Sequence, residues 1–176
     1  MLLAAAAFTI IFAFRRSDWR NWQRYHDTLI YISMSNLLYN FVYDDKKLWQ
    51  YMPDHFASDL LVTLVILPLT GLIFLTNYPD SFTAQAVKIL KYVSVYFAVE
   101  ALFWFIGVIE YDNGWHIWLS LPWNIVMFPL WALHHKKPLL AYAASCVLLI
   151  VMEIVFPSGH SLSGLISLRS ILVSAL

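Results

Sequence analysis

The sequence predicts an all-α protein, a polytopic transmembrane bundle of six helices. Three observations predict this fold: the 176 residues contain six long apolar stretches, 61% of the residues are hydrophobic, and only 12% are charged. A soluble domain carries about 25% charged residues. Because a membrane-spanning helix needs about 20 apolar residues, six helices and their links use almost the whole chain. We therefore expect a single transmembrane domain over residues 1–156.

Short polar links separate the six stretches, and each stretch is expected to form one helix. They cover residues 1–14, 28–43, 56–78, 84–111, 115–133 and 138–156. The first stretch is short, and the bundle has five spans if residues 1–14 do not cross. Strands are not expected, because the apolar runs do not alternate in polarity. The Ser-rich tail, residues 157–176, is expected either to lie at the membrane interface or to be disordered.

The distribution of positive charge predicts the orientation. Cytoplasmic links are enriched in Lys and Arg. Eight positive residues fall on one side of the predicted bundle, namely Arg15, Arg16, Arg20, Arg24, Lys88, Lys91, Lys136 and Lys137. Three fall on the other side, namely Lys46, Lys47 and Arg169. This predicts a multi-pass protein of the cell membrane with both termini outside, in which Arg15, Arg16, Lys136 and Lys137 contact anionic lipid headgroups.

Glu100 is the leading candidate for a functional residue. It lies near the middle of the stretch 84–111, where a charge costs about 2.5–3.5 kcal/mol. It is therefore expected to face the interior of the bundle. Tyr96 and Trp104 lie one turn before and after it, on the same face of the helix. The function predicted for this face is a proton or cation site, and an interhelical hydrogen bond that fixes packing is an equal alternative.

Amide side chains are the expected partners of this acid. No Lys or Arg lies at a similar depth in another helix, so we expect Glu100 to be neutral or hydrogen-bonded, with Asn36, Asn40 or Asn124 as its partner. Asn36 and Asn40 belong to a polar stripe on the second helix. Such stripes join helices through hydrogen bonds without burying a charge, so structural glue is favoured there over a path for solutes.

The outer turn from Glu110 to His116 contains two acids, Glu110 and Asp112, and an imidazole. Its spacing matches no strong ligand template, so a plain loop is favoured, and we predict neither a metal nor a cofactor. The net charge of zero offers no basic surface for nucleic acid. The expected partners are the lipid bilayer and either another membrane protein or a second copy of the chain.

Pro157, Ser158, Gly159 and His160 resemble the middle signature of the lipid-phosphate phosphatase superfamily. In that superfamily the histidine protonates the leaving group, and a second histidine downstream is the nucleophile. No His or Asp follows His160, and the upstream Arg-Pro pair is absent. Without a nucleophile there is no covalent step. We therefore assign no catalytic residue, and an intramembrane lipid-phosphate enzyme is only a minor alternative.

The order of motifs over residues 15–150 resembles an uncharacterised family of small polytopic membrane proteins of bacilli and clostridia. The matching segments are Arg15–Phe41, Leu48–Tyr51, Pro68–Pro79, the helix of Glu100, Glu110–Trp118 and Met127–Tyr142. The resemblance implies a helical membrane bundle in a Gram-positive plasma membrane. It implies no reaction, because the family has no assigned activity.

The predicted function is that of an integral membrane protein without enzymatic chemistry, acting as an accessory, sensing or structural component. The alternative is a small transporter or channel subunit in which Glu100 couples to a proton or cation.

Overall fold

The computed structural model describes residues 1–52 and 56–159, and this part of the chain is mostly helical. The predicted tail lies outside the described residues from His160 onward. The main helices are α1 (Leu2–Arg16), α2 (His26–Val42), α3 (Phe56–Leu61), α4 (Leu67–Leu75), α5 (Phe82–Phe105), α6 (Ile117–Lys136) and α7 (Pro138–Val155). A 3₁₀ turn, η1 (Trp19–Arg24), precedes α2, and a π-helical turn, η2 (Val62–Ile66), joins α3 to α4. The predicted all-α class is confirmed, and each of the six apolar stretches contains a helix.

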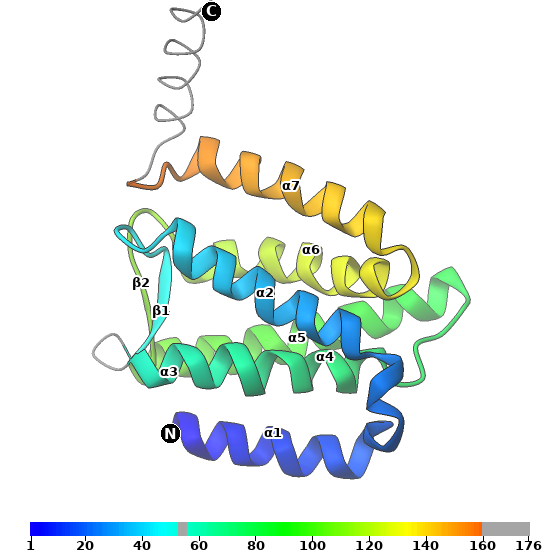
Figure 1. Ribbon diagram of the computed structural model, residues 1–176. Helices are drawn as coiled ribbons and strands as arrows, with labels where there is room; N and C mark the ends of the chain where they lie inside the picture. Colours follow the sequence, from blue (N-terminus) through cyan, green and yellow to red (C-terminus); the bar gives the residue numbers. More distant parts are fainter. Residues whose placement is uncertain (53–55, 160–176) are drawn as a thin grey trace, which may run out of the picture.

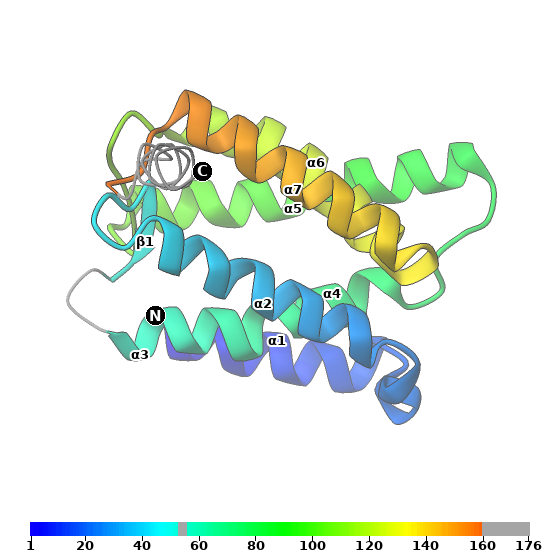
Figure 2. The same cartoon turned by 45° about the horizontal axis from the view of Figure 1, so that its top comes forward.

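The helices form an up-and-down bundle (Figure 1). α1 packs on α4, α4 packs on α2, and α2 packs on α6, which also contacts α5 and α7. Figure 2 shows α2 between the rod formed by α3 and α4 and the pair formed by α6 and α7. The beginning of α1 and the end of α7 lie at the same end of the bundle as the two short strands (Figure 1).

A two-stranded antiparallel sheet at this end corrects the expectation that strands are absent. β1 (Trp49–Tyr51) pairs with β2 (Ile109–Tyr111), and Trp49 lies opposite Tyr111. Tyr39 of α2 holds β1 in place. Its hydroxyl accepts hydrogen bonds from the backbone N–H groups of Leu48 and Trp49 and donates one to the Trp49 carbonyl, at 2.8–2.9 Å. The pairing joins segments about 60 residues apart, so no local pattern in the sequence indicates it.

The same segment corrects the predicted end of the fourth stretch, Tyr111. α5 ends at Phe105, because Gly107 adopts a positive φ of 73°. The N–H of Gly107 bonds to the Trp104 carbonyl, and the N–H of Val108 bonds to the Phe103 carbonyl at 2.8 Å. These two bonds form the Schellman motif that closes a helix at a glycine. The chain then turns directly into β2.

Aromatic side chains fill the centre of the bundle. Phe74 and Phe128 have no exposed surface, and their ring centroids lie 5.0 Å apart. Phe128 also contacts Tyr92, Tyr96 and Trp131, with centroid distances of 5.1–5.9 Å. Rings that meet edge to face at such distances stabilise a core beyond the area that they bury. The core thus joins α4, α5 and α6.

Two helical segments of the described chain are long and apolar enough to cross a membrane, Ala57–Leu75 and Pro138–Val155. The outer surface of the bundle also carries many large apolar side chains. They include Phe8 on α1, Phe105 on α5 and Ile154 on α7, which are 68–82% exposed.

Where α2 meets α4 the chain has a glycine, and a Cβ at Gly71 would overlap Cδ1 of Ile32. Small residues of this kind let two helix backbones approach closely.

Candidate functional site

Glu100 is held by two donors from other elements. Tyr111, at the end of β2, donates a hydrogen bond from its hydroxyl to Oε1 at 2.9 Å. Asn124, a buried residue of α6, donates from Nδ2 to Oε2 at 3.0 Å. Both oxygens of the carboxyl group therefore accept a hydrogen bond from a neighbouring element. Among the described residues, no Lys or Arg forms an ion pair with Glu100.

These bonds continue toward the strand end of the bundle as a chain of polar groups. Nε1 of Trp115 donates to the Ser120 hydroxyl at 3.2 Å, and that hydroxyl donates to Oη of Tyr111 at 3.3 Å. Ser120 and Asn124 are each only 1% exposed. Every donor in this series of hydrogen bonds points toward Glu100, so the acid is the final acceptor of the network.

The position of Glu100 along its helix differs from the prediction. Because α5 ends at Phe105 rather than near Tyr111, Glu100 lies five residues before the end of the helix. At 1.5 Å per residue this is about 8 Å from the helix end. The acid therefore lies in the half of the bundle nearest the strands and not at its middle.

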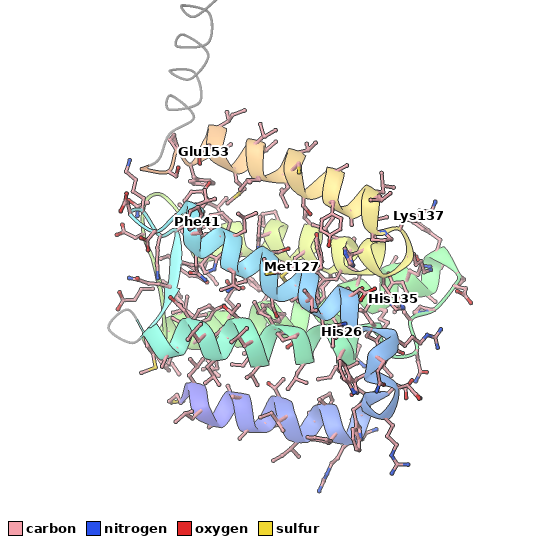
Figure 3. The ribbon with its side chains drawn as sticks, in the orientation of Figure 1. His26, Phe41, Met127, His135, Lys137 and Glu153 are labelled. Carbon is pink, nitrogen blue, oxygen red and sulfur yellow. The ribbon has the colours of Figure 1, made fainter. Side chains whose placement is uncertain are left out.

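A cavity of about 160 Å³ lies beside the acid. We call it the acid cavity. It lies among α2, α5, α6, α7 and β1, and its polar wall includes Asn36, Glu100, Ser120 and Asn124. Figure 3 shows Met127, another lining residue, near the middle of the bundle. Apart from Ser35 and Ser145, the rest of the wall is apolar or aromatic. An apolar cavity with a few convergent polar groups is the usual form of a small-molecule site.

A second cavity, of about 320 Å³, lies on the other side of Glu100. We call it the α1 cavity. It is lined by apolar residues of α1 and by parts of η2, α4 and α5. Tyr51, Tyr96 and Glu100 line both cavities. These three side chains therefore form a shared wall between the two spaces.

The structure brings together four of the six predicted intramembrane candidates. Glu100, Tyr96, Asn36 and Asn124 line the acid cavity. Asn124 is the amide that binds the acid, whereas the Asn36 amide donates to Oγ1 of Thr63 at 2.6 Å. This bond links α2 to the π-helical turn η2.

Trp104 and Asn40 do not belong to the site. Trp104 is 47% exposed and does not line the acid cavity, because the carboxyl group of Glu100 is directed toward α6 and β2 rather than along its own helix. Nδ2 of Asn40 donates to the backbone carbonyl of Asn36, one turn earlier in α2, at 3.1 Å. Its amide therefore bonds within its own helix instead of reaching the acid.

The sequence did not indicate Tyr111 and Ser120 as site residues. Tyr111 lies in the segment for which the sequence favours a plain outer turn, and only the pairing of β2 with β1 places it beside Glu100.

Glu153 is a further acid inside a long helix. Its Oε1 accepts bonds from the N–H and hydroxyl of Ser158, at 3.1 and 2.9 Å. It fixes the turn after α7.

The basic residues predicted to contact lipid headgroups lie at the opposite end from the strands. His26, His135 and Lys137 lie at this end, whereas Phe41 and Glu153 lie at the strand end (Figure 3). Arg15, Arg16, Lys136 and Lys137 are all exposed. The Nζ of Lys136 also lies 5.4 Å from the ring centre of Tyr78.

The sequence also raises two other kinds of site, a metal site and a phosphatase-like catalytic site. Within residues 1–52 and 56–159, no group of three or more His, Cys, Asp or Glu side chains is placed to hold a metal ion. His160, on which the phosphatase resemblance depends, lies outside the described residues.

Comparisons with known proteins identify no family for this chain. No protein-family model matches the chain, and neither a search of curated proteins nor a search of solved structures finds a match.

Proposed function

We propose that the chain is a six-pass integral membrane protein whose acid cavity binds a small ligand without enzymatic chemistry. In this proposal it serves as a sensing or accessory component of a cell membrane. Its contacts would be the bilayer and either another membrane protein or a second copy of the chain. The resemblance over residues 15–150 supports a helical membrane bundle and leaves the ligand open.

The exposed surface supports the membrane location. Large apolar side chains point outward along the helices, for example Leu3, Val87 and Leu139, which are 64–83% exposed. Apolar patches of this extent mark membrane or partner surfaces. α5 and α6 contain 24 and 20 residues, or about 36 and 30 Å of helix, against a hydrocarbon core of about 30 Å.

The charge distribution supports the orientation. The exposed residues Arg15, Arg16, Lys136 and Lys137 lie at one end. We place this end in the cytoplasm, because positive links are retained there and meet anionic headgroups. The strand end, with the start of α1 and the end of α7, is then outside.

The observation that carries the binding function is the environment of Glu100. A carboxyl group that two neutral donors fix beside a cavity, without an ion pair among the described residues, is available to a ligand in that cavity. Ionisable residues in membrane helices usually mark substrate or ion paths. An acid that served only to fix the packing of the helices would need no cavity beside it.

A transporter or channel subunit is the second candidate. The observation that favours it is that Glu100 lines both cavities and therefore separates two spaces within the bundle.

Proteoliposomes with a pH-sensitive dye inside distinguish the two functions. Binding without transport predicts no proton flux above that of empty liposomes, whereas coupled transport predicts a flux that Glu100→Gln abolishes.

Cysteine accessibility tests the cavity in the bilayer. Asn36 lines the acid cavity, whereas Met34, two residues earlier in α2, is 57% exposed on the outer surface. In a Cys146→Ala background, we expect Asn36→Cys to react with a small water-soluble thiosulfonate and Met34→Cys to remain unreactive, because a thiol facing lipid does not ionise. The measurement is the rate of modification in liposomes by mass spectrometry. Faster reaction at position 34 than at position 36 would contradict both the membrane location and the hydrated cavity.

A further inference from the structure

The wall of the acid cavity is unusually rich in aromatic rings. Nine of its 23 lining side chains are Tyr or Trp, and its single charged residue is Glu100. No Lys or Arg is among these lining residues. The cavity thus combines one negative charge with many electron-rich ring faces.

Three indoles on this wall form a compact group. The ring centroid of Trp49 lies 4.8 Å from that of Trp115 and 5.5 Å from that of Trp123, and the Trp115 and Trp123 centroids lie 6.1 Å apart. The rings meet at 51–84° instead of stacking flat. Tyr39 stacks on Trp49 at 3.9 Å and 3° and fixes its plane. At these distances the three rings contact one another, so together they form one aromatic patch on the wall of the cavity.

Such a wall discriminates between ligands by charge. The faces of Trp and Tyr rings attract cations, and Trp does so most strongly. Glu100 adds a full negative charge, which would repel an anion and would stay unmatched beside a neutral molecule. Methyl-substituted ammonium groups suit this wall better than a bare ammonium, because they are weakly hydrated and contact rings through apolar surface.

The volume sets the size of the group. A cavity of about 160 Å³ compares with the engineered cavity of about 150 Å³ that holds one benzene molecule. A trimethylammonium group fits this space, whereas a whole lipid does not. A longer ligand would leave the remainder of its length outside the cavity.

We propose that the acid cavity binds a small methylated ammonium group, with Trp49, Trp115 and Trp123 as the ring wall and Glu100 as the counter-charge. This inference rests on the proposed binding function and names its ligand class. The group belongs either to a free small cation or to a choline-type lipid headgroup. The ring wall and the acid recognise the same chemistry in both.

Calorimetric titration of the detergent-solubilised full chain tests the proposal. The probes are tetramethylammonium, choline and 3,3-dimethyl-1-butanol, which has the shape of choline without its charge. We expect both cations to bind and the neutral alcohol to bind about tenfold more weakly or worse. We expect Glu100→Gln and Trp123→Leu to weaken choline binding by a similar factor. The matched controls are Glu110→Gln, on the exposed acid of β2, and Trp118→Leu, on the 70% exposed indole of α6.

Each outcome decides one part of the proposal. Equal binding of choline and its neutral analogue, lost in Trp123→Leu, would overturn the cation assignment and leave the binding cavity in place. Absence of binding by all three probes would overturn the cation assignment, and the reactivity of Asn36→Cys then decides separately whether the hydrated cavity exists. The comparison of probes on the unaltered chain does not depend on the folding of any variant.

A second arm identifies the source of the ammonium group. In phosphatidylcholine liposomes a headgroup that enters the cavity would compete with free choline, whereas phosphatidylglycerol liposomes provide no competitor. Weaker choline binding in the first liposomes alone supports the headgroup, and equal binding in both supports the free cation.

Discussion

Glu100→Leu is expected to lower the free energy of unfolding by about 1–3 kcal/mol. The substitution removes the acceptor of the Tyr111 hydroxyl and of the Asn124 amide. The Tyr111 hydroxyl can turn toward Ser120, 3.3 Å away, but Asn124 is 1% exposed and its amide is left without this acceptor. A buried donor without a partner costs its full desolvation energy. Thermal unfolding in detergent, followed by tryptophan fluorescence, measures the change.

The double variant Glu100→Leu with Asn124→Leu is the control for this prediction. Removing both partners of a buried hydrogen bond costs less than removing one. We therefore expect the double variant to be more stable than Glu100→Leu alone, with a coupling energy of about 1 kcal/mol. Additive losses, or a Glu100→Leu variant as stable as the original chain, would show that the bond between Asn124 and Glu100 is not formed.

Phe128→Ala is expected to cost about 2–4 kcal/mol of unfolding free energy. Phe128 has no exposed surface and lies against the rings of Phe74, Tyr92, Tyr96 and Trp131. Truncation of a buried Phe costs about 3–5 kcal/mol in water-soluble proteins. In a bilayer the transfer from water contributes little, and mainly the lost packing remains. The measurement is the shift of the thermal unfolding midpoint in detergent.

Phe105→Ala is the matched control for the core substitution. Phe105 is 82% exposed at the end of α5, so its ring has few protein contacts to lose. We expect its unfolding midpoint to stay close to that of the original chain. A loss as large as that of Phe128→Ala would mean that the exposed ring packs against another chain or that the core is wrongly placed.

The sequence predicts the helices of this protein well, because helices in an apolar chain depend on local runs of hydrophobic residues. All six stretches contain helices, and the polar links between them hold the turns. The end of α5 was misplaced by about one and a half turns, because the apolar run continues past Gly107 while the backbone does not. A positive φ at a glycine is a local stop that hydropathy cannot detect.

The candidate site was predicted only in part, for a similar reason. An acid in an apolar run stands out, and so do amides in neighbouring helices, which is how Glu100 and Asn124 were found. The remaining partners depend on contacts between distant segments. Tyr111 reaches Glu100 only because β2 pairs with β1, and the cavity exists only because α2 and α7 both pack on α6. Trp104 lies one turn from Glu100 but does not line the acid cavity, and spacing along one helix does not say which neighbour an acid contacts.

Site-directed labelling across the bilayer tests the central claim most directly. Single cysteines are introduced into a Cys146→Ala background at the exposed positions Arg20, Lys46, Asp80, His116 and Lys137. In intact cells, a membrane-impermeant maleimide is predicted to label positions 46 and 116, and to label positions 20, 80 and 137 only after the membrane is permeabilised. Labelling of positions 80 and 116 from the same side would contradict the six-pass bundle and, with it, an intramembrane cavity at Glu100.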